Sequence, residues 1–322
     1  MEIEGFIRDG NAALKGARFS PRKLVAIHSG VTLAASALIA VVSQVLGSME
    51  TAGGLSGMGT QTALATAQSF LELVQLILTP FWGAGLTFAA LCWVRNGQAS
   101  PASLLEGFRR FKPVLTSTLL LGMRYFGFAI LAALLAANLI LFTPMALPLY
   151  GAQLETADAA AMMAALGDQA MPFLIGYAAI FAVLFGVFAL PFHYRYRMTQ
   201  WLVMDKPGTG GMQAMFVSQL MTRRRRMAMF KLDLKFWWYY LLQFAATAVS
   251  MVGAFFSPAV YWCALLGSMA LQLAISILGR PRLEAAWGQC YEHMLKNAPP
   301  EPPQPKPIDP KDLPWNGWGP TD

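Results

Sequence analysis

Residues 222–242 read TRRRRMAMFKLDLKFWWYYLL, and this stretch constrains how the rest of the chain can be arranged. Four consecutive arginines, Arg223 to Arg226, are followed by Lys231 and Lys235, then by an aromatic cluster and a long apolar run. Each arginine costs roughly 2.5–3.5 kcal/mol at the centre of a bilayer, whereas Trp and Tyr favour the headgroup zone. The stretch therefore marks a cytoplasmic membrane surface, and the other segments can be placed relative to it.

The composition is typical of a chain embedded in a membrane. Of the 322 residues, 56% are hydrophobic and 13% are charged, against roughly 25% charged residues in soluble domains. The net charge of +7 resides in segments between apolar runs, which favours an anionic lipid surface over nucleic acid as the partner. The three cysteines are scattered and match neither a disulfide framework nor a metal-site spacing.

Six apolar runs are long enough to cross a bilayer as helices. The expected spans are about 24–46, 67–94, 114–141, 172–192, 236–256 and 259–278. The first run is longer than the apolar region of a cleavable signal, so we interpret it as an uncleaved anchor. The sequence predicts an all-α, polytopic transmembrane bundle over residues 24–281.

The distribution of basic residues predicts the topology. Of the 24 Lys and Arg residues, five precede the first span, four lie at 95–112, nine lie at 195–235, five follow the sixth span, and one is Arg124. The loops expected on the other side hold none, as the positive-inside rule requires. We therefore expect an even number of spans, with the N- and C-termini cytoplasmic.

The segments outside the spans have patterns of their own. Residues 1–23 mix apolar and basic side chains, which predicts a cytoplasmic, interfacial helix. Residues 100–111, which read SPASLLEGFRRF, are expected to form a short surface helix. Gly279 and Pro281 are expected to end the sixth span, so that residues 282–297 form a separate cytoplasmic helix.

The C-terminal residues differ from the rest of the chain. Nine of the last 25 residues are proline, a composition that predicts a disordered or polyproline II tail at 298–322. The tail is either a spacer or a docking segment for a cytoplasmic partner, because proline-rich segments bind aromatic grooves.

Five short motifs, which lie near the N-terminus and after residue 193, are the basis of a resemblance to a known family. They are ALKGAR at 13–18, YRYRMTQWLVMDKPGTGGMQAM at 194–215, SQLMTRRRR at 218–226, MFKLDLKFWWYYLL at 229–242 and LEAAWGQCYEHML at 283–295. In these motifs the chain resembles an uncharacterised family of bacterial six-span membrane proteins, related to the membrane domain of some glycerophosphodiester phosphodiesterases. The resemblance implies that fold and a bacterial inner membrane, and it implies no activity. The four arginines stand where the family has a Lys-Gly-Asn/His-Lys segment, without its glycine.

Two sets of polar residues are candidates for function. The first is a polybasic set that suits anionic lipid headgroups, since Arg binds phosphate through two N–H groups at once; the alternative is that it only sets topology. Its members are Arg223, Arg224, Arg225, Arg226, Lys231 and Lys235. The second set consists of Glu72, Arg124 and His28, which lie within expected spans, where ionisable residues are functional candidates.

These patterns favour a protein that is not an enzyme. The chain has no GxSxG, no HExxH and no phosphate-cradling loop, and its three histidines lie in different segments, so we expect no cofactor or metal. The leading hypothesis is a scaffold or lipid-interacting accessory protein of the bacterial inner membrane. The alternative is a transporter or channel-like carrier of a small or lipidic solute.

Overall fold

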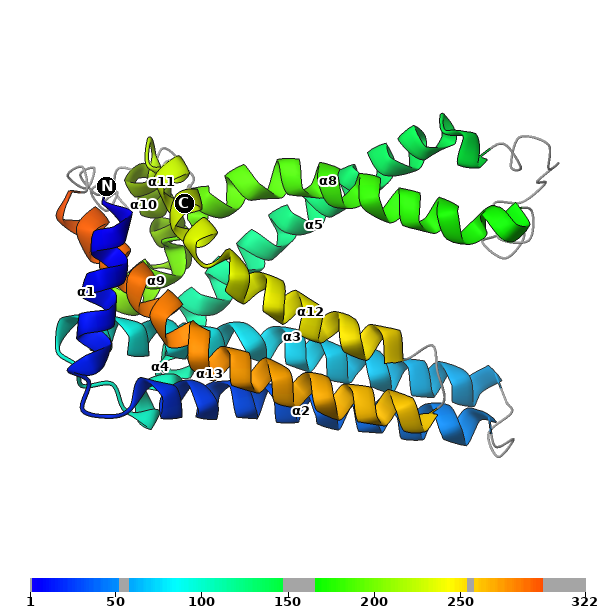
Figure 1. Ribbon diagram of the computed structural model, residues 1–322, viewed down its shortest axis with the longest axis horizontal. Coiled ribbons are helices and arrows are strands. Elements are labelled where there is room, and N and C mark those ends of the chain that lie inside the picture. The colour runs from blue at the N-terminus through cyan, green and yellow to red at the C-terminus, as the bar shows by residue number, and fades with distance from the viewer. Residues whose placement is uncertain (1, 52–57, 147–165, 254–257, 298–322) are drawn as a thin grey trace, which may run out of the picture.

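The chain folds into helices, with no strand among the residues that the computed structural model describes, which are 2–51, 58–146, 166–253 and 258–297 (Figure 1). The long helices are α2 (Pro21–Thr51), α3 (Met58–Arg95), α5 (Phe111–Leu141), α8 (Ala170–Tyr196), α12 (Trp237–Gly253) and α13 (Pro258–Lys296). The shorter helices are α1 (Ile3–Lys15), α4 (Glu106–Arg109), α9 (Thr199–Asp205), α10 (Gly211–Thr222) and α11 (Arg226–Lys235), with 3-10 turns η1 (Pro101–Leu105), η2 (Pro144–Ala146) and η3 (Gly167–Gln169).

Five of these segments are long and apolar enough to cross a membrane. They are Pro21–Val42, Thr66–Arg95, Phe111–Leu141, Ala170–Asp205 and Ala259–Lys296. Along them many large apolar side chains face outward, including Leu76, Met123 and Phe126, as expected of helices solvated by lipid tails. The fold is thus that of an all-helical membrane protein. Of the span predicted at 236–256, the 17 residues of α12 are described.

The long helices form hairpins that bring the four basic segments to one end of the molecule (Figure 1). The Arg18 N–H donates to the Gly97 carbonyl at 3.0 Å, and Arg110 donates to the Val203 carbonyl at 2.9 Å. Arg95 Nε donates to Glu292 Oε1 at 2.6 Å. These contacts join the N-terminal segment, the 95–112 loop, the 195–235 segment and the end of α13. We call this region the basic end.

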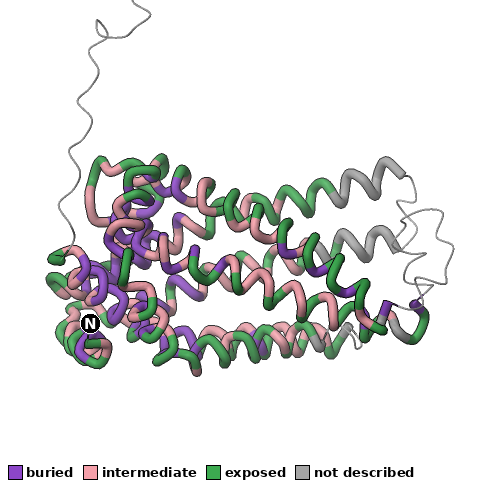
Figure 2. The backbone as a smooth tube through the Cα atoms, turned by 90° about the horizontal axis from the view of Figure 1, so that it is seen from above, coloured by how far each residue is buried: buried purple, intermediate pink, exposed green. Residues whose placement is uncertain are grey.

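Burial is concentrated at the basic end, whereas the helices further along consist mainly of intermediate and exposed residues (Figure 2). One hydrophobic cluster there includes Trp93 of α3, Trp201 of α9 and Trp287 of α13. The amphipathic helix α1 also packs on α13, with Phe6 and His293 ring centroids 5.3 Å apart. The predicted N-terminal helix is therefore present, and part of its apolar face lies against protein.

Two carboxylates tie the helices of the basic end together. Asp233 of α11 accepts hydrogen bonds from Tyr194 (2.8 Å), Tyr240 (3.0 Å) and Trp287 (3.0 Å), which lie on three other helices. Asp205 accepts from Tyr291 at 2.8 Å and pairs with Arg95. Both carboxylates are half-buried, and such partners offset the cost of removing a charge from water.

The predicted break before residue 282 is wrong. Helix α13 continues for 39 residues, from Pro258 to Lys296, with Pro281 inside it. Gly279 instead allows α12 to pack closely on α13, because a Cβ at this position would lie 2.5 Å from the ring of Tyr239 on α12. The loss of one backbone hydrogen bond at Pro281 is tolerated because α1 and α12 both pack along the same helix.

The segment predicted as a short surface helix at 100–111 forms η1 and α4, and it packs against α3. Leu104 is 1% exposed, and Gly85 of α3 lies so close that a Cβ there would overlap the Leu104 carbonyl. In the same way, a Cβ at Gly107 would overlap the carbonyl oxygen of Phe81 on α3. The turn η1 begins at Pro101, and the Ser100 N–H before it donates to Ser103 Oγ at 3.2 Å. Two glycines thus allow η1 and α4 to lie directly on α3.

Candidate anion-binding recess

The four arginines form a tight turn between α10 and α11. Helix α10 ends at Thr222, whose hydroxyl donates to the Arg195 carbonyl of α8 at 3.0 Å and so holds the turn against that helix. Arg224 adopts a left-handed backbone conformation, with φ of +69°. The Arg225 N–H then donates to the Thr222 carbonyl at 3.0 Å, and α11 begins at Arg226. The turn is therefore made although the left-handed residue is an arginine and not a glycine.

A recess of about 270 Å³ opens at this turn. It is lined by Leu220, Met221, Arg223, Arg224, Arg225 and Asn297. Arg225 reaches across it, and its Nη2 donates to the Asn297 carbonyl at 3.2 Å. Its Nη1 is buried without a hydrogen-bond partner among the described residues. The Nε atoms of Arg195, Arg197 and Arg226 are likewise buried without a described partner, so such donors are a feature of the basic end as a whole.

The electrostatics of the recess favour an anion. Within the described ranges, no carboxylate lies within 4.0 Å of a guanidinium nitrogen of Arg223 to Arg226. The positive end of α11, a helix of ten residues, begins directly after the turn, although none of its residues lines the recess. By contrast, Arg95 pairs with Asp205 and Glu292.

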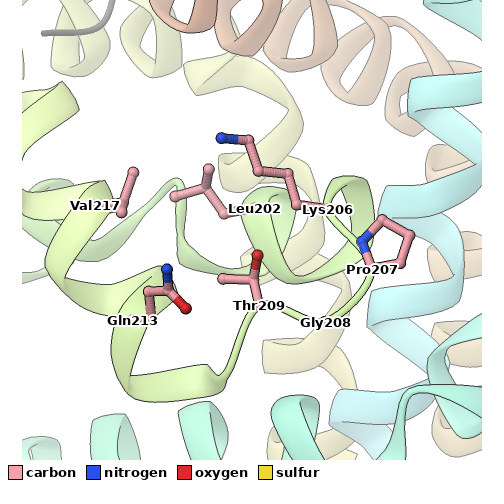
Figure 3. Close-up of a pocket in the computed structure, with 7 residues that line it drawn as sticks. All are labelled: Leu202, Lys206, Pro207, Gly208, Thr209, Gln213 and Val217. Carbon is pink, nitrogen blue, oxygen red and sulfur yellow. The ribbon is translucent and has the colours of Figure 1, made fainter. Parts of the chain in front are cut away.

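Two other recesses at the basic end are less suited to an anion. One, of about 280 Å³, lies at the turn between α9 and α10, and its polar lining groups are Lys206, Thr209 and Gln213 (Figure 3). Lys206 is the single cation there. The other, of about 620 Å³, lies between α1 and the end of α11 and is lined by both Glu4 and Lys235. The arginine recess differs from these two because three guanidinium groups line it and no carboxylate is among its described lining residues.

The six predicted headgroup residues do not form one site. Arg223, Arg224 and Arg225 share the recess, whereas Lys231 is exposed on α11 outside its lining. Arg226 is half-buried at the start of α11. Lys235 lies beside α1, where its Nζ is 3.5 Å from Glu4 Oε1. The six cations lie within 13 residues of one another in the sequence, but α11 is a helix, and it carries Lys231 and Lys235 away from the turn.

The predicted intramembrane polar residues have separate partners. Glu72 is exposed on α3 and accepts from Gln68 at 3.2 Å. Arg124 of α5 donates to the Tyr196 hydroxyl at 2.7 Å and lies over the rings of Tyr196 and Phe192.

His28 is the third of these residues and is 4% exposed. Its ring stacks on Trp82 with 5.6 Å between centroids, and Trp82 Nε1 donates to the His28 carbonyl at 3.0 Å. Both ring nitrogens lack a hydrogen-bond partner in the described part of the chain. Glu72, Arg124 and His28 are therefore not joined by direct hydrogen bonds.

Sequence reasoning missed Asn297 as a member of the recess. Asn297 lies 72 residues after Arg225, and no local pattern connects the two positions. Only the length of α13 brings it back to the turn. Among the described residues, no group of three or more His, Cys, Asp or Glu side chains is arranged to hold a metal ion.

Comparison of the chain with family models, with curated proteins and with solved structures finds no match. Its function is therefore argued from its own residues.

Proposed function

We propose that this protein is a non-enzymatic accessory protein or scaffold of a bacterial inner membrane that binds anionic lipid headgroups in the arginine recess. The observation that carries the proposal is the recess itself, which Arg223, Arg224 and Arg225 line and where no described carboxylate lies within 4.0 Å of their guanidinium nitrogens. A phosphate group supplies the acceptors that these guanidinium groups lack.

The proposal includes six spans with both termini in the cytoplasm, so that the recess faces the cytoplasmic leaflet. In support, α12 and α13 pack together as a hairpin, and the four basic segments contact one another at one end. The cytoplasmic leaflet is rich in anionic lipid, which attracts juxtamembrane cations by about 1 kcal/mol per basic residue near the surface. The resemblance to bacterial six-span proteins is consistent with this placement.

The test is retention of anionic lipid by purified protein. In the triple variant Arg223→Gln, Arg224→Gln, Arg225→Gln, three guanidinium groups are replaced by neutral amides of similar polarity. We expect native mass spectrometry to show at least a fivefold loss of bound phosphatidylglycerol relative to the unmodified chain, measured after purification from the same membrane.

The matched control is Lys15→Gln, Lys23→Gln, Lys112→Gln, which removes three exposed cations outside the recess. We expect this variant to lose less than half of the bound lipid. Equal losses in both triple variants would show that only the total charge of the basic end matters. Unchanged lipid in the arginine variant would remove the proposed function.

The second candidate function is a carrier of a small or lipidic solute. It rests on His28, a buried imidazole whose ring nitrogens have no protein partner in the described residues. Carriers gather polar groups at one site within the membrane, whereas Glu72 and Arg124 bond to Gln68 and Tyr196. The separate partners favour lipid binding as the first proposal. Solute uptake into proteoliposomes that stops in His28→Ala and persists in the arginine triple variant would reverse this order.

A further inference from the structure

Helix α10 presents an apolar stripe that leads to the arginine recess. Met212 and Phe216 are 68% and 51% exposed, although α10 is too short to be one of the candidate spans. Leu220 follows four residues later and lines the recess, and Arg223 comes three residues after it. Residues spaced by three or four lie on one face of a helix. The stripe therefore places exposed apolar side chains and guanidinium groups in a row, which matches the acyl chain and headgroup of a lipid.

The number of charged donors at the recess indicates which kind of phosphate it suits. A phosphodiester carries one negative charge and two non-ester oxygens. A phosphomonoester carries about −1.5 to −2 charges near neutral pH, because its second pKa is about 6, and it offers three strong acceptor oxygens. Three guanidinium groups line the recess, so a monoester, with its higher charge and third oxygen, can engage more of their N–H donors than a diester can.

The partner already present in the recess leads to the same conclusion. Arg225 Nη2 donates a hydrogen bond to the Asn297 carbonyl. Because this acceptor is neutral, it does not balance the positive charge of the guanidinium group. Nη1 of the same side chain is buried and has no partner in the described residues. A ligand with higher charge balances more of the positive charge that Arg223, Arg224 and Arg225 bring to the recess.

We infer that the arginine recess selects lipids with a phosphomonoester headgroup over phosphodiester lipids, with the acyl chain lying along Met212 and Phe216. This inference rests on the proposed function and names the class of lipid.

The experiment uses the full-length protein in nanodiscs of phosphatidylcholine at pH 8. The probes are dioctanoyl phosphatidate, dioctanoyl phosphatidylglycerol, glycerol 3-phosphate and inorganic phosphate, and the dissociation constant of each is measured by thermophoresis. We expect phosphatidate to bind at least tenfold more tightly than phosphatidylglycerol. We also expect it to bind at least tenfold more tightly than glycerol 3-phosphate, which has the same phosphate without acyl chains.

Two variants separate the headgroup from the apolar stripe. Arg225→Gln is expected to reduce the preference for phosphatidate to less than threefold. Met212→Ser with Phe216→Ser is expected to weaken phosphatidate at least fivefold and to leave glycerol 3-phosphate unchanged. The control is Met227→Ser, which removes a methionine of α11 that is 69% exposed, close to the 68% of Met212. It is expected to change neither the affinity for phosphatidate nor that for glycerol 3-phosphate.

The outcomes distinguish this inference from the proposed function. Equal affinity for phosphatidate and phosphatidylglycerol, both lost in the arginine triple variant, would overturn the selectivity and leave the proposed function standing. If glycerol 3-phosphate or inorganic phosphate bound as tightly as phosphatidate, the acyl chains would contribute nothing. That result would contradict a lipid ligand and make a free phosphate the ligand. Affinities that the arginine triple variant does not change would overturn both.

Discussion

Arg224 adopts a backbone conformation that arginine seldom takes, and this one residue shapes the recess. Its φ of +69° turns the chain between α10 and α11 so that its neighbours line the same cavity. The left-handed region costs a residue with a Cβ roughly 1–2 kcal/mol, and glycine adopts it without that penalty. A strained residue retained in a turn is often a functional one, and here the strained side chain carries one of the three charges.

The strain predicts a difference between two substitutions at this position. Arg224→Gly relieves the strain, whereas Arg224→Val introduces a β-branched residue that fits the left-handed region worst. We expect the glycine variant to be more stable than the valine variant by about 1–2 kcal/mol, measured by thermal unfolding in detergent. Both variants lose the same charge, so electrostatics cancel in the comparison. Identical melting temperatures would show that the turn is not held in this conformation.

At the same scale, the sequence predicts part of the candidate site. Arg223, Arg224 and Arg225 are adjacent, so a local pattern was enough to single them out. Asn297 and the burial of His28 depend on how distant helices pack, and neither has a local signal. Lys231 and Lys235 were grouped with the arginines because charge alone does not show in which direction a helix carries each side chain.

Among the elements, the contact of η1 and α4 with α3 depends on two glycines. Gly85 and Gly107 face the carbonyl oxygens of Leu104 and Phe81 so closely that a Cβ at either position would overlap them. The obstacle is backbone, which cannot move aside as the end of a flexible side chain can. The 95–112 loop, with Arg95 and Arg110, is held at the basic end through this contact.

The close approach predicts a large effect from a small substitution. Gly85→Ala is expected to destabilise the protein by about 3 kcal/mol or more, because a methyl group has no space there. Gly122→Ala on α5 is the control, since a Cβ at Gly122 meets nothing within 4 Å. It is expected to be neutral or slightly stabilising, because alanine favours helix. Thermal unfolding and expression level are the measurements; comparable stability of the two variants would refute the packing.

The elements also show where sequence patterns mislead. Gly279 and Pro281 carry the residue types that end helices, and α13 nevertheless continues past both. Tertiary packing outweighs the local preference, because Tyr239 occupies the space above Gly279. Likewise, Asp205 and Asp233 carried no sequence signal, although they connect several helices. Buried hydrogen-bond networks depend on three-dimensional proximity, which periodicity does not report.

At the scale of the whole molecule, composition predicted the fold class, because an apolar chain with clustered basic residues has few soluble alternatives. The all-helical architecture with long apolar helices is confirmed. The six-span count stays a prediction, since five segments meet the length and composition of a span and α12 is described for 17 residues. The expected tail at 298–322 lies outside the described residues.

The topology leads to a prediction about accessibility. In a Cys263→Ser background, Gly54→Cys is placed in a loop expected outside, and Arg224→Cys in the turn expected inside. We expect a membrane-impermeant maleimide to label the first variant in intact bacterial cells and the second only after the inner membrane is permeabilised. Labelling of Arg224→Cys in intact cells would place the basic end outside and contradict the proposed topology.

The most direct test of the central claim is a density map of the protein in lipid nanodiscs that contain phosphatidate and phosphatidylglycerol. The account predicts headgroup density within hydrogen-bond distance of the Arg223, Arg224 and Arg225 guanidinium groups, with acyl-chain density extending along Met212 and Phe216. A recess without density, in a map where lipid is resolved elsewhere on the basic end, would contradict it.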